Sequence, residues 1–384
     1  MTRTEKLLAE LIALPSVNPA FASAGAAARP AHAGGSNYGE KKVADYLASV
    51  AADAGLDVEL QTVLPGRANL IARLQPAHRV KQTILLAPHL DTVGADEGQF
   101  IPQLKNGRWH GRGACDTKGS VAAMLSALCN VAATRSRPRE TEIVFAGLID
   151  EENVQAGSRA LAASGFQANL AIVGEPTKLQ AVTAHKGSLW LRLETHGRAA
   201  HGATPQLGKN AVHEMARVVE ILETGYAAQL RRRKHALLGA GTVNVGKISG
   251  GKQPNIVPDY CEILVDRRTL PGETEAGVRR EISARLKAKG LSARVSSDKS
   301  VPCLALETDF KLPLVQQLFA AAGQSKPVGV QYFCDAAVLS AAGIPSVVFG
   351  PGDIAQAHTA DEWISLAQLE RAKDLLVRFL NSLP

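Results

Sequence analysis

Imidazole and carboxylate side chains follow several apolar runs of this sequence, at points where strands would end. They are His89 and Asp91 after ILLAP, Glu151 and Glu152 after EIVFAGLID, Glu175 after NLAIVG, and His358 on the loop after SVVFGPG. In an open α/β sheet, ligand-binding groups gather at the carboxyl ends of the strands, so we expect these side chains to meet at one edge. A further acid, Asp116, lies in the loop GRGACDTKG. Two imidazoles and at least three carboxylates around one point suit Zn²⁺, with Co²⁺ or Mn²⁺ as substitutes.

Each of these residues taken alone also has a purely structural interpretation. A lone histidine at a strand end is more often part of a hydrogen-bonded framework, and Asp116 suits a turn or a helix cap. His89 and Asp91 point to the same side if the strand continues, so the carboxylate can hold the second imidazole nitrogen. Glu151 and Glu152 are neighbours that face different ways, so one can bind a metal while the other acts as a base. A carboxylate shared between two ions about 3.5–4 Å apart would hold a hydrolytic water between them.

The first half of the chain and its end alternate helical and strand-like patterns. Continuous apolar runs separated by helices predict buried strands of a largely parallel sheet. The predicted strands are 57–63, 68–74, 82–87, 142–149, 169–174 and 346–350. The predicted helices are 5–13, 38–54, one that follows Lys118, 312–322 and 366–382. The fold class is therefore α/β, with a mostly parallel sheet.

The middle of the chain has a different order of elements. It comprises a strand at 188–196, a helix at 208–224, strands at 242–249 and 256–267, a helix at 275–289 and a strand at 291–297. This β-α-β-β-α-β order is the split βαβ, or ferredoxin-like, arrangement. It predicts an α+β domain at 183–298 that is inserted into a discontinuous catalytic domain made of 1–182 and 299–384.

Composition and charge favour a cytoplasmic protein that acts on a small molecule. No apolar run approaches the roughly 20 residues that cross a bilayer, so no membrane partner is expected. Five scattered cysteines without a CxxC pair suit a reducing compartment. The net charge of +7 is dispersed apart from residues 231–234, and aromatic residues make up only 4%, so we expect no nucleic-acid partner. A positive net charge suits a small anionic substrate equally well.

Five motifs, in family order, carry a resemblance that covers nearly the whole chain. They are HLDTV at 89–93, GRGACDTKG at 111–119, DEE at 150–152, GEPT at 174–177 and AQAH at 355–358. The chain thereby resembles the co-catalytic zinc aminoacylase and carboxypeptidase family, which includes acetylornithine deacetylase, succinyl-diaminopimelate desuccinylase and glutamate carboxypeptidase. Cys115 and the segment YFCDAA at 332–337 are more similar to the acetylornithine deacetylase branch than to the desuccinylase branch.

The resemblance implies two zinc ions per subunit and a role for each residue around them. The implied ligands are His89 and Glu175 on one ion, Glu152 and His358 on the other, and Asp116 as the bridge between them. Glu151 is then the general base, and Asp91 orients His89. The peptide bond that follows Asp116 is usually cis in this family.

The resemblance also implies substrate contacts and an oxyanion-binding histidine. His201 lies in GRAAHGATPQLGKNA, and without the resemblance it would be interpreted as a cap of the following helix. The implied substrate-binding residues are Asn255, Arg268, Gly350 and Gly352. An arginine offers a bidentate fork for a substrate carboxylate. Family members commonly form homodimers through the inserted domain and lend its histidine to the neighbouring active site.

The leading functional hypothesis is a metal-dependent hydrolase that cleaves the amide bond of an N-acyl amino acid, as acetylornithine deacetylase does. One alternative is a dipeptidase or glutamate-type carboxypeptidase of the same family. Another is a non-catalytic binding protein that retains the fold, which missing ligands would favour, and none is missing. The Ala/Gly-rich stretch from Phe21 to Gly35 is longer than a minimal member needs, and the sequence assigns it no purpose.

Overall fold

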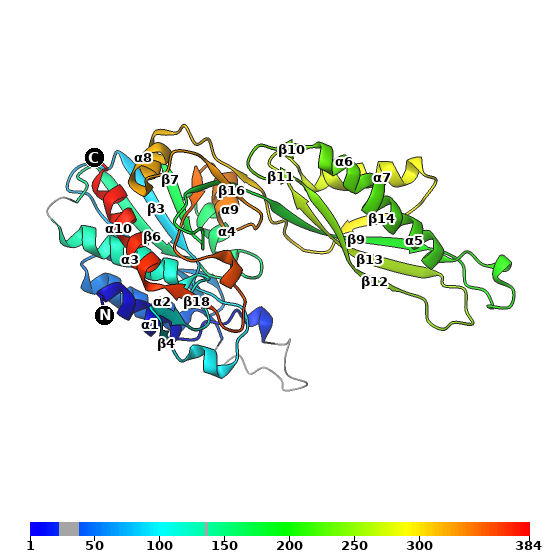
Figure 1. Cartoon of the computed structure of the whole chain (residues 1–384), viewed down its shortest axis with the longest axis horizontal. Coiled ribbons are helices and arrows are strands. Elements are labelled where there is room, and N and C mark those ends of the chain that lie inside the picture. Colours follow the sequence, from blue (N-terminus) through cyan, green and yellow to red (C-terminus); the bar gives the residue numbers. More distant parts are fainter. Residues whose placement is uncertain (23–37, 135–136) are drawn as a thin grey trace. The chain divides into compact units, whose positions relative to one another are not determined.

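The computed structural model describes residues 1–22, 38–134 and 137–384. The chain divides into two units (Figure 1). Unit 1 comprises Met1–Thr183, Thr308–Val328 and Cys334–Pro384, and unit 2 comprises Ala184–Glu307 and Gly329–Phe333. Unit 2 therefore extends beyond the predicted insertion of 183–298 and takes in a second, short segment. The Ala/Gly-rich stretch lies outside the described residues from residue 23 onward.

The largest sheet of the described residues is mixed rather than largely parallel. In spatial order its strands are β1 (Asp57–Leu64), β2 (Arg67–Leu74), β6 (Thr141–Gly147), β3 (Gln82–Pro88), β7 (Leu170–Gly174), β17 (Ser346–Val348), β8 (Val182–His185) and β15 (Leu306–Glu307), with β16 (Val328–Val330) paired to β8. The neighbours β6, β3, β7 and β17 are parallel, whereas β1, β2, β8 and β15 pair antiparallel. The turn between β1 and β2 is too short for the crossover that parallel strands need. The α/β fold is thus confirmed, with parallel pairing at the centre of the sheet.

Helices of unit 1 bury their apolar sides against this sheet and one another. They are α1 (Arg3–Ile12), α2 (Lys41–Asp53), α3 (Lys118–Ala133), α4 (Ala156–Ala163), α8 (Pro313–Ala322), α9 (Ala336–Ala341) and α10 (Leu366–Asn381). Helix α3 is apolar around most of its circumference, and it packs against α1, α10 and the central strands (Figure 1). A helix that is apolar all round is expected to be buried, and α3 forms the middle of the core.

Shorter elements complete unit 1. A small sheet has the order β18 (Trp363–Ser365), β5 (Arg108–His110) and β4 (Gln103–Lys105). Single turns of 3-10 helix lie at Pro19–Phe21, Glu97–Phe100 and Ile354–Gln356. Across the described ranges, no helix combines the length and the apolar character that a membrane span requires.

Unit 2 has the predicted β-α-β-β-α-β order. Its main elements are β9 (Gly187–His196), α5 (Ala211–Ile221), β12 (Thr242–Gly250), β13 (Tyr260–Thr269), α7 (Glu275–Ala288) and β14 (Arg294–Ser297). Between α5 and β12 lie a π-helical turn (Leu222–Tyr226), α6 (Ala227–Arg232), β10 (Lys234–His235) and β11 (Gly239–Ala240), and a 3-10 turn at Pro205–Leu207 precedes α5. The sheet is antiparallel, in the order β12-β13-β9-β14, as a ferredoxin-like fold requires. Its core is separate from that of unit 1.

Helix α5 begins three residues later than the predicted start at 208. The side chain of Asn210 accepts a hydrogen bond from the N–H of His213 at 3.1 Å, which makes Asn210 the N-cap. His201 therefore does not cap this helix, and its side chain is free of the structural role that the residues alone suggested.

A buried lysine joins the end of α1 to the start of α3. Lys118 is 1% exposed, and its ammonium group donates to the carbonyl oxygens of Leu11 at 2.9 Å and Leu14 at 2.7 Å. Carbonyl groups at a helix C-terminus lack partners within the helix, so a side-chain donor here replaces the missing bonds. The contact fixes the position of α3, and with it the loop that carries Asp116.

We expect Lys118→Met to lower the free energy of unfolding by about 1–3 kcal/mol, because it leaves buried carbonyl oxygens without this donor while keeping the length of the side chain. Urea denaturation of the metal-free protein measures the change. The control is Lys6→Met in α1, where the exposed lysine pairs with Glu10 at 3.8 Å. Equal stability of the two variants would show that the Lys118 contact contributes nothing.

Candidate metal centre

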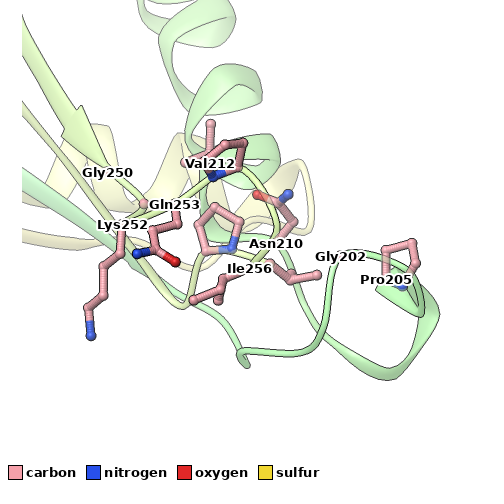
Figure 2. Close-up of a pocket in the computed structure, with 12 residues that line it drawn as sticks. Gly202, Pro205, Asn210, Val212, Gly250, Lys252, Gln253 and Ile256 are labelled. Carbon is pink, nitrogen blue, oxygen red and sulfur yellow. The ribbon is translucent and has the colours of Figure 1, made fainter.

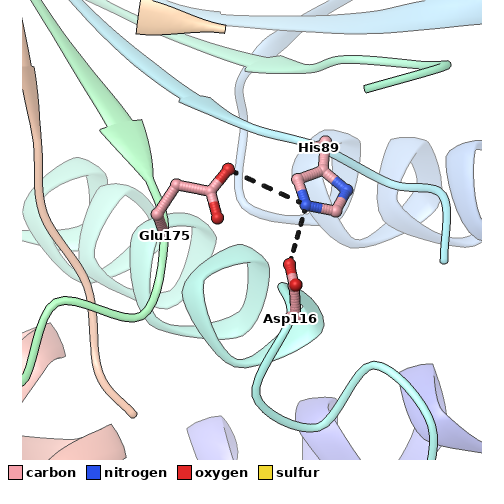
Figure 3. Close-up of side chains that lie close together, drawn as sticks. All are labelled: His89, Asp116 and Glu175. Carbon is pink, nitrogen blue, oxygen red and sulfur yellow. Dashed lines mark hydrogen bonds and ion pairs between the residues drawn. The ribbon is translucent and has the colours of Figure 1, made fainter. Parts of the chain in front are cut away.

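Neighbouring parallel strands deliver the predicted ligands to one edge of the sheet. His89 follows β3 directly, Glu152 lies just beyond β6, and Glu175 follows β7. Asp116 precedes α3, and His358 lies on the loop after β17. Since parallel neighbours end at the same side, this topology brings the side chains together. Figure 3 shows the carboxylates of Asp116 and Glu175 directed at the ring of His89.

The ligand atoms form two groups that share Asp116. In the first group, His89 Nε2 lies 3.1 Å from Asp116 Oδ1 and 3.9 Å from Glu175 Oε1. In the second, His358 Nε2 lies 3.4 Å from Asp116 Oδ2 and 3.2 Å from Glu152 Oε1. Within each group the ligand atoms all lie within 4.8 Å of one another. The two oxygens of one carboxylate thus face two different groups, as a bridging ligand would.

The charges in these groups fit a bound cation. Within the described part of the chain, the carboxylates of Glu152 and Glu175 have ion pairs only with the two histidines. Burial, together with the nearby charge of Asp116, raises the pKa of Glu175 well above its usual range. Buried acids that repel one another need a compensating positive charge. Imidazole nitrogens and carboxylate oxygens are ligands that Zn²⁺ accepts, so the donor set fits a divalent metal.

Glu151 stands beside these groups without belonging to either. Its carboxylate makes no hydrogen bond within the described residues, whereas its backbone N–H donates to Asp91 Oδ1 at 3.1 Å. Burial raises the pKa of Glu151 well above its usual range, and the charge of Glu175 raises it further. A carboxylate with a raised pKa and no fixed partner is suited to carry a proton.

Asp91 fixes the turn that carries both glutamates. Its Oδ2 accepts from the N–H of Glu152 at 3.1 Å, while its Oδ1 accepts from Glu151. The Nδ1 of His89 lies 3.0 Å from the carbonyl oxygen of Asp91 and 3.5 Å from the carboxylate. The backbone carbonyl is therefore the nearer partner of the imidazole. Asp91 holds the His89 ring through its backbone as well as its side chain, which leaves Nε2 toward the other ligands.

Asn18 is a buried residue of this network that the sequence reading missed. Its amide group donates to Asp91 Oδ2 at 2.8 Å and to Asp150 Oδ1 at 3.0 Å, so it lies between two buried acids. Arg67 compensates the second acid, with its guanidinium 3.0 Å from Asp150 and a bidentate pair to Glu40. No apolar periodicity or ligand motif marks Asn18, because its role depends on contacts with residues more than 70 positions away.

The predicted glycines of the loop after β17 make hydrogen bonds within unit 1, and their role toward a substrate remains a prediction. The N–H of Gly350 donates to Thr177 Oγ1 at 3.0 Å, and that of Gly352 donates to Gln368 Oε1 at 2.9 Å. A Cβ at Gly350 would lie 2.6 Å from the carbonyl oxygen of Glu175. These two N–H groups are therefore engaged within unit 1, and glycine is required here because the backbone approaches a ligand segment closely.

The other predicted residues, His201, Asn255 and Arg268, belong to unit 2. The N–H of Gly202 donates to the carbonyl oxygen of Asn255 at 2.8 Å, so the loops of His201 and Asn255 are paired. A pocket of about 520 Å³ lies beside them, lined by residues such as Asn210 and Ile256 (Figure 2). The roles of these three residues toward a substrate remain predictions.

The peptide bond between Asp116 and Thr117 is cis, which confirms the expectation drawn from the family resemblance. A mixed α/β sheet with two metal-ligand groups at the ends of its parallel strands supplies the arrangement that a metal-dependent hydrolase needs. Residues 85–382 match the model of Peptidase family M20/M25/M40, and the chain belongs to this family.

Similar proteins agree with this assignment. The chain is 30% identical to acetylornithine deacetylase of Proteus mirabilis, over 98% of this chain and 96% of the relative. It is 31% identical to acetylornithine deacetylase of Myxococcus xanthus, over 87% of this chain and 90% of the relative. Among solved structures, the aminopeptidase PepT of Bacillus cereus matches with a TM-score of 0.76 at 22% identity, over 99% and 97% of the two chains. The YXEP protein of Bacillus subtilis, a dinuclear metal-binding peptidase of the M20 family, matches with a TM-score of 0.71 at 12% identity, over 99% and 97%.

We expect Asn18→Asp to destabilise the protein more at pH 8 than at pH 5. The new carboxylate would face Asp91 and Asp150, so its pKa would be raised in the folded state. An acid with a raised pKa in the folded state loses stability as the pH rises through the range between its unfolded and folded pKa values. The loss at pH 8 should be about 1–3 kcal/mol, measured by urea denaturation at both pH values.

The control for this prediction is Asn18→Ala, which removes the same two hydrogen bonds without adding a charge. Its loss of stability should be nearly the same at both pH values. If the two variants lost equal stability at each pH, the amide of Asn18 would not be separating the two acids.

Proposed function

We propose that this chain is a two-zinc hydrolase that removes the acyl group from an N-acyl amino acid. The observation that carries the proposal is the carboxylate of Asp116, whose two oxygens lie 3.1 Å from His89 Nε2 and 3.4 Å from His358 Nε2. The likeness to acetylornithine deacetylases over most of the chain supports the choice of an acyl-amino-acid substrate. Relatives with that name make N-acetylornithine the first substrate to test.

Each ligand group would hold one of the two proposed ions. His89 and Glu175 would hold one zinc ion, Glu152 and His358 would hold the other, and Asp116 would contact both. When bound, the ions supply Lewis-acid polarisation of the scissile carbonyl and a water of lowered pKa. Co²⁺ or Mn²⁺ would be accepted by the same ligand set as substitutes.

Glu151 carries the proton in the proposed reaction. Its raised pKa allows it to accept a proton from the attacking water and to return that proton to the nitrogen of the leaving amine. The N–H of Glu151 donates a hydrogen bond to Asp91 Oδ1 at 3.1 Å. This bond fixes the backbone, so only the side chain moves between the two proton transfers. Both transfers require a group that gains and loses a proton readily near neutral pH.

A cationic pocket of unit 2 is suited to the free carboxylate of the substrate. The pocket has a volume of about 470 Å³ and is lined by Lys186, Thr242, Arg268, Gln331 and Tyr332. Asp266 pairs with Nε of Arg268 at 2.9 Å, which orients the guanidinium and leaves its other N–H groups for a ligand. Lys186, which was not predicted from the sequence, adds a second positive charge to the lining of the same pocket. Asn255 would make a further polar contact with the substrate.

His201 would stabilise the oxyanion that forms on the attacked carbonyl. Its Nδ1 accepts a hydrogen bond from the N–H of Ala203 at 3.1 Å, so a neutral ring carries its proton on Nε2. The exposed ring therefore presents a donor, which is what an oxyanion requires. We propose that the chain forms a homodimer and that His201 acts in the partner's active site.

A cytoplasmic location suits the five cysteines, all of which are free thiols.

The proposal is tested by an activity screen on metal-free and metal-loaded protein. We expect N-acetylornithine to be deacetylated with zinc or cobalt present and not after treatment with a strong chelator. N-succinyl-diaminopimelate and dipeptides are the comparison substrates. Preferential cleavage of dipeptides would favour a peptidase, and full activity in protein shown by elemental analysis to lack metal would rule out the two-zinc proposal.

Glu151→Gln should lower turnover by about 10²–10⁴-fold, because the amide cannot carry the proton. Metal content should stay the same, since Glu151 belongs to neither ligand group. Elemental analysis and steady-state kinetics on the purified variant measure both quantities. Near-normal turnover would remove Glu151 from the mechanism.

The Glu151→Gln variant also tests whether His201 acts across a dimer interface. His201→Ala should lower turnover by about 10²–10³-fold, which is the usual effect of losing one oxyanion donor. Mixing it with Glu151→Gln under conditions that exchange subunits should restore activity, because a mixed dimer then has one site with both groups intact. Lack of recovery despite proven exchange would mean that His201 serves its own subunit or only the fold.

A further inference from the structure

Glu362 is a buried acid that lies next to the metal-ligand groups without being part of either. It follows His358 by four residues and is 1% exposed. Its carboxylate accepts four hydrogen bonds, from the N–H groups of Cys115 (2.8 Å) and Asp116 (2.9 Å) at Oε1 and from the N–H of Gly113 (3.0 Å) and the guanidinium of Arg112 (2.7 Å) at Oε2. Three of these donors belong to the backbone of the loop that ends in Asp116.

The backbone of this loop needs an acceptor at its centre. Gly111 and Gly113 have φ angles of 150° and 80°, so the chain turns tightly and directs the N–H groups of Gly113, Cys115 and Asp116 to one side. Such a concave run of N–H groups binds an anion, and here the anion is a side chain of the same protein. Without the carboxylate, three buried N–H groups would lack a partner, and the loop would have to change its path to satisfy them.

Glu362 is itself held firmly in place. Its carbonyl oxygen accepts from the N–H of Gly111 at 3.0 Å. The next residue begins β18, in which Trp363 pairs with His110 of β5. The acid is therefore anchored by its backbone to the same segment that its side chain binds. A group fixed in this way can determine where Asp116 lies, since the N–H of Asp116 is one of its donors.

The position of Asp116 affects both ligand groups because its two oxygens face different histidines. A shift of the loop would therefore lengthen contacts in both groups at once. A purely structural role is the competing explanation, in which Glu362 and Arg112 form a buried salt bridge that only stabilises the fold. The distribution of the bonds argues against it, since most of them go to the loop backbone rather than to Arg112.

We propose that Glu362 is a positioning residue that fixes the bridging carboxylate of Asp116, so that both metal positions depend on it. This inference rests on the proposed function, because it assumes the two-ion centre. Partners that orient metal ligands typically contribute about 10–100-fold to metal affinity. A change at Glu362 should therefore weaken metal binding at both positions, whereas removal of a ligand from one group should weaken metal binding mainly at one position.

The test compares zinc binding by Glu362→Gln, His358→Ala and wild type. Glutamine keeps the size of the side chain but removes the charge and directs an N–H₂ group at two of the donors. Competition with a coloured chelator of known affinity should give about 10–100-fold weaker binding of both ions in Glu362→Gln. His358→Ala should weaken one ion strongly while leaving the other close to wild type. The matched control is Asp361→Asn, which changes the preceding exposed acid and should bind zinc as wild type does.

Urea denaturation of the metal-free proteins separates positioning from folding. A folded Glu362→Gln with wild-type affinity for both ions would overturn the inference, as would a loss confined to one ion. If Glu362→Gln does not fold, Glu362→Asp takes its place, because it keeps the charge but shortens the reach to the loop. Wild-type zinc affinity in that variant would likewise overturn the inference. Failure of the wild-type protein to bind two ions would contradict the proposed function instead.

Discussion

Several buried carboxylates lie close together at the candidate metal centre and repel one another. Removing an ionised acid from water costs several kcal/mol unless it is paired or hydrogen-bonded. The acids of the two ligand groups have only His89 and His358 as ion-pair partners within the described residues. A divalent cation offsets that repulsion, so the same arrangement that strains the metal-free protein favours metal binding.

Two acids outside the ligand groups, Asp91 and Glu362, are compensated by backbone N–H groups, and these hydrogen bonds position the ligands. Asp91 follows His89 by two residues and accepts from the backbone of Glu151 and Glu152. Glu362 follows His358 by four residues and accepts from the loop of Asp116. In both cases an acid next to one ligand holds the backbone of another. The ligands come from separate chain segments, and these contacts join their positions directly rather than through the distant core.

Much of this arrangement could be predicted from the sequence, because strand ends and ligand types are local signals. The apolar run before His89 and the acidic pair after EIVFAGLID predicted both the strands and the edge where their side chains meet. The antiparallel edges of the main sheet were not predicted, since the pairing partner of a strand is not a local property. Asn18 and Glu362 were missed because each acts on residues far along the chain. An acid four residues after the last histidine ligand was the available signal for Glu362.

The proposed chemistry depends on Asp116 being shared by two metal ions. A crystal structure of the zinc-loaded protein, with anomalous diffraction measured on both sides of the zinc edge, tests it most directly. We expect two anomalous peaks about 3.5–4 Å apart, one contacting each oxygen of Asp116. A single peak, or two peaks of which only one contacts Asp116, would show that Asp116 is not shared by two ions.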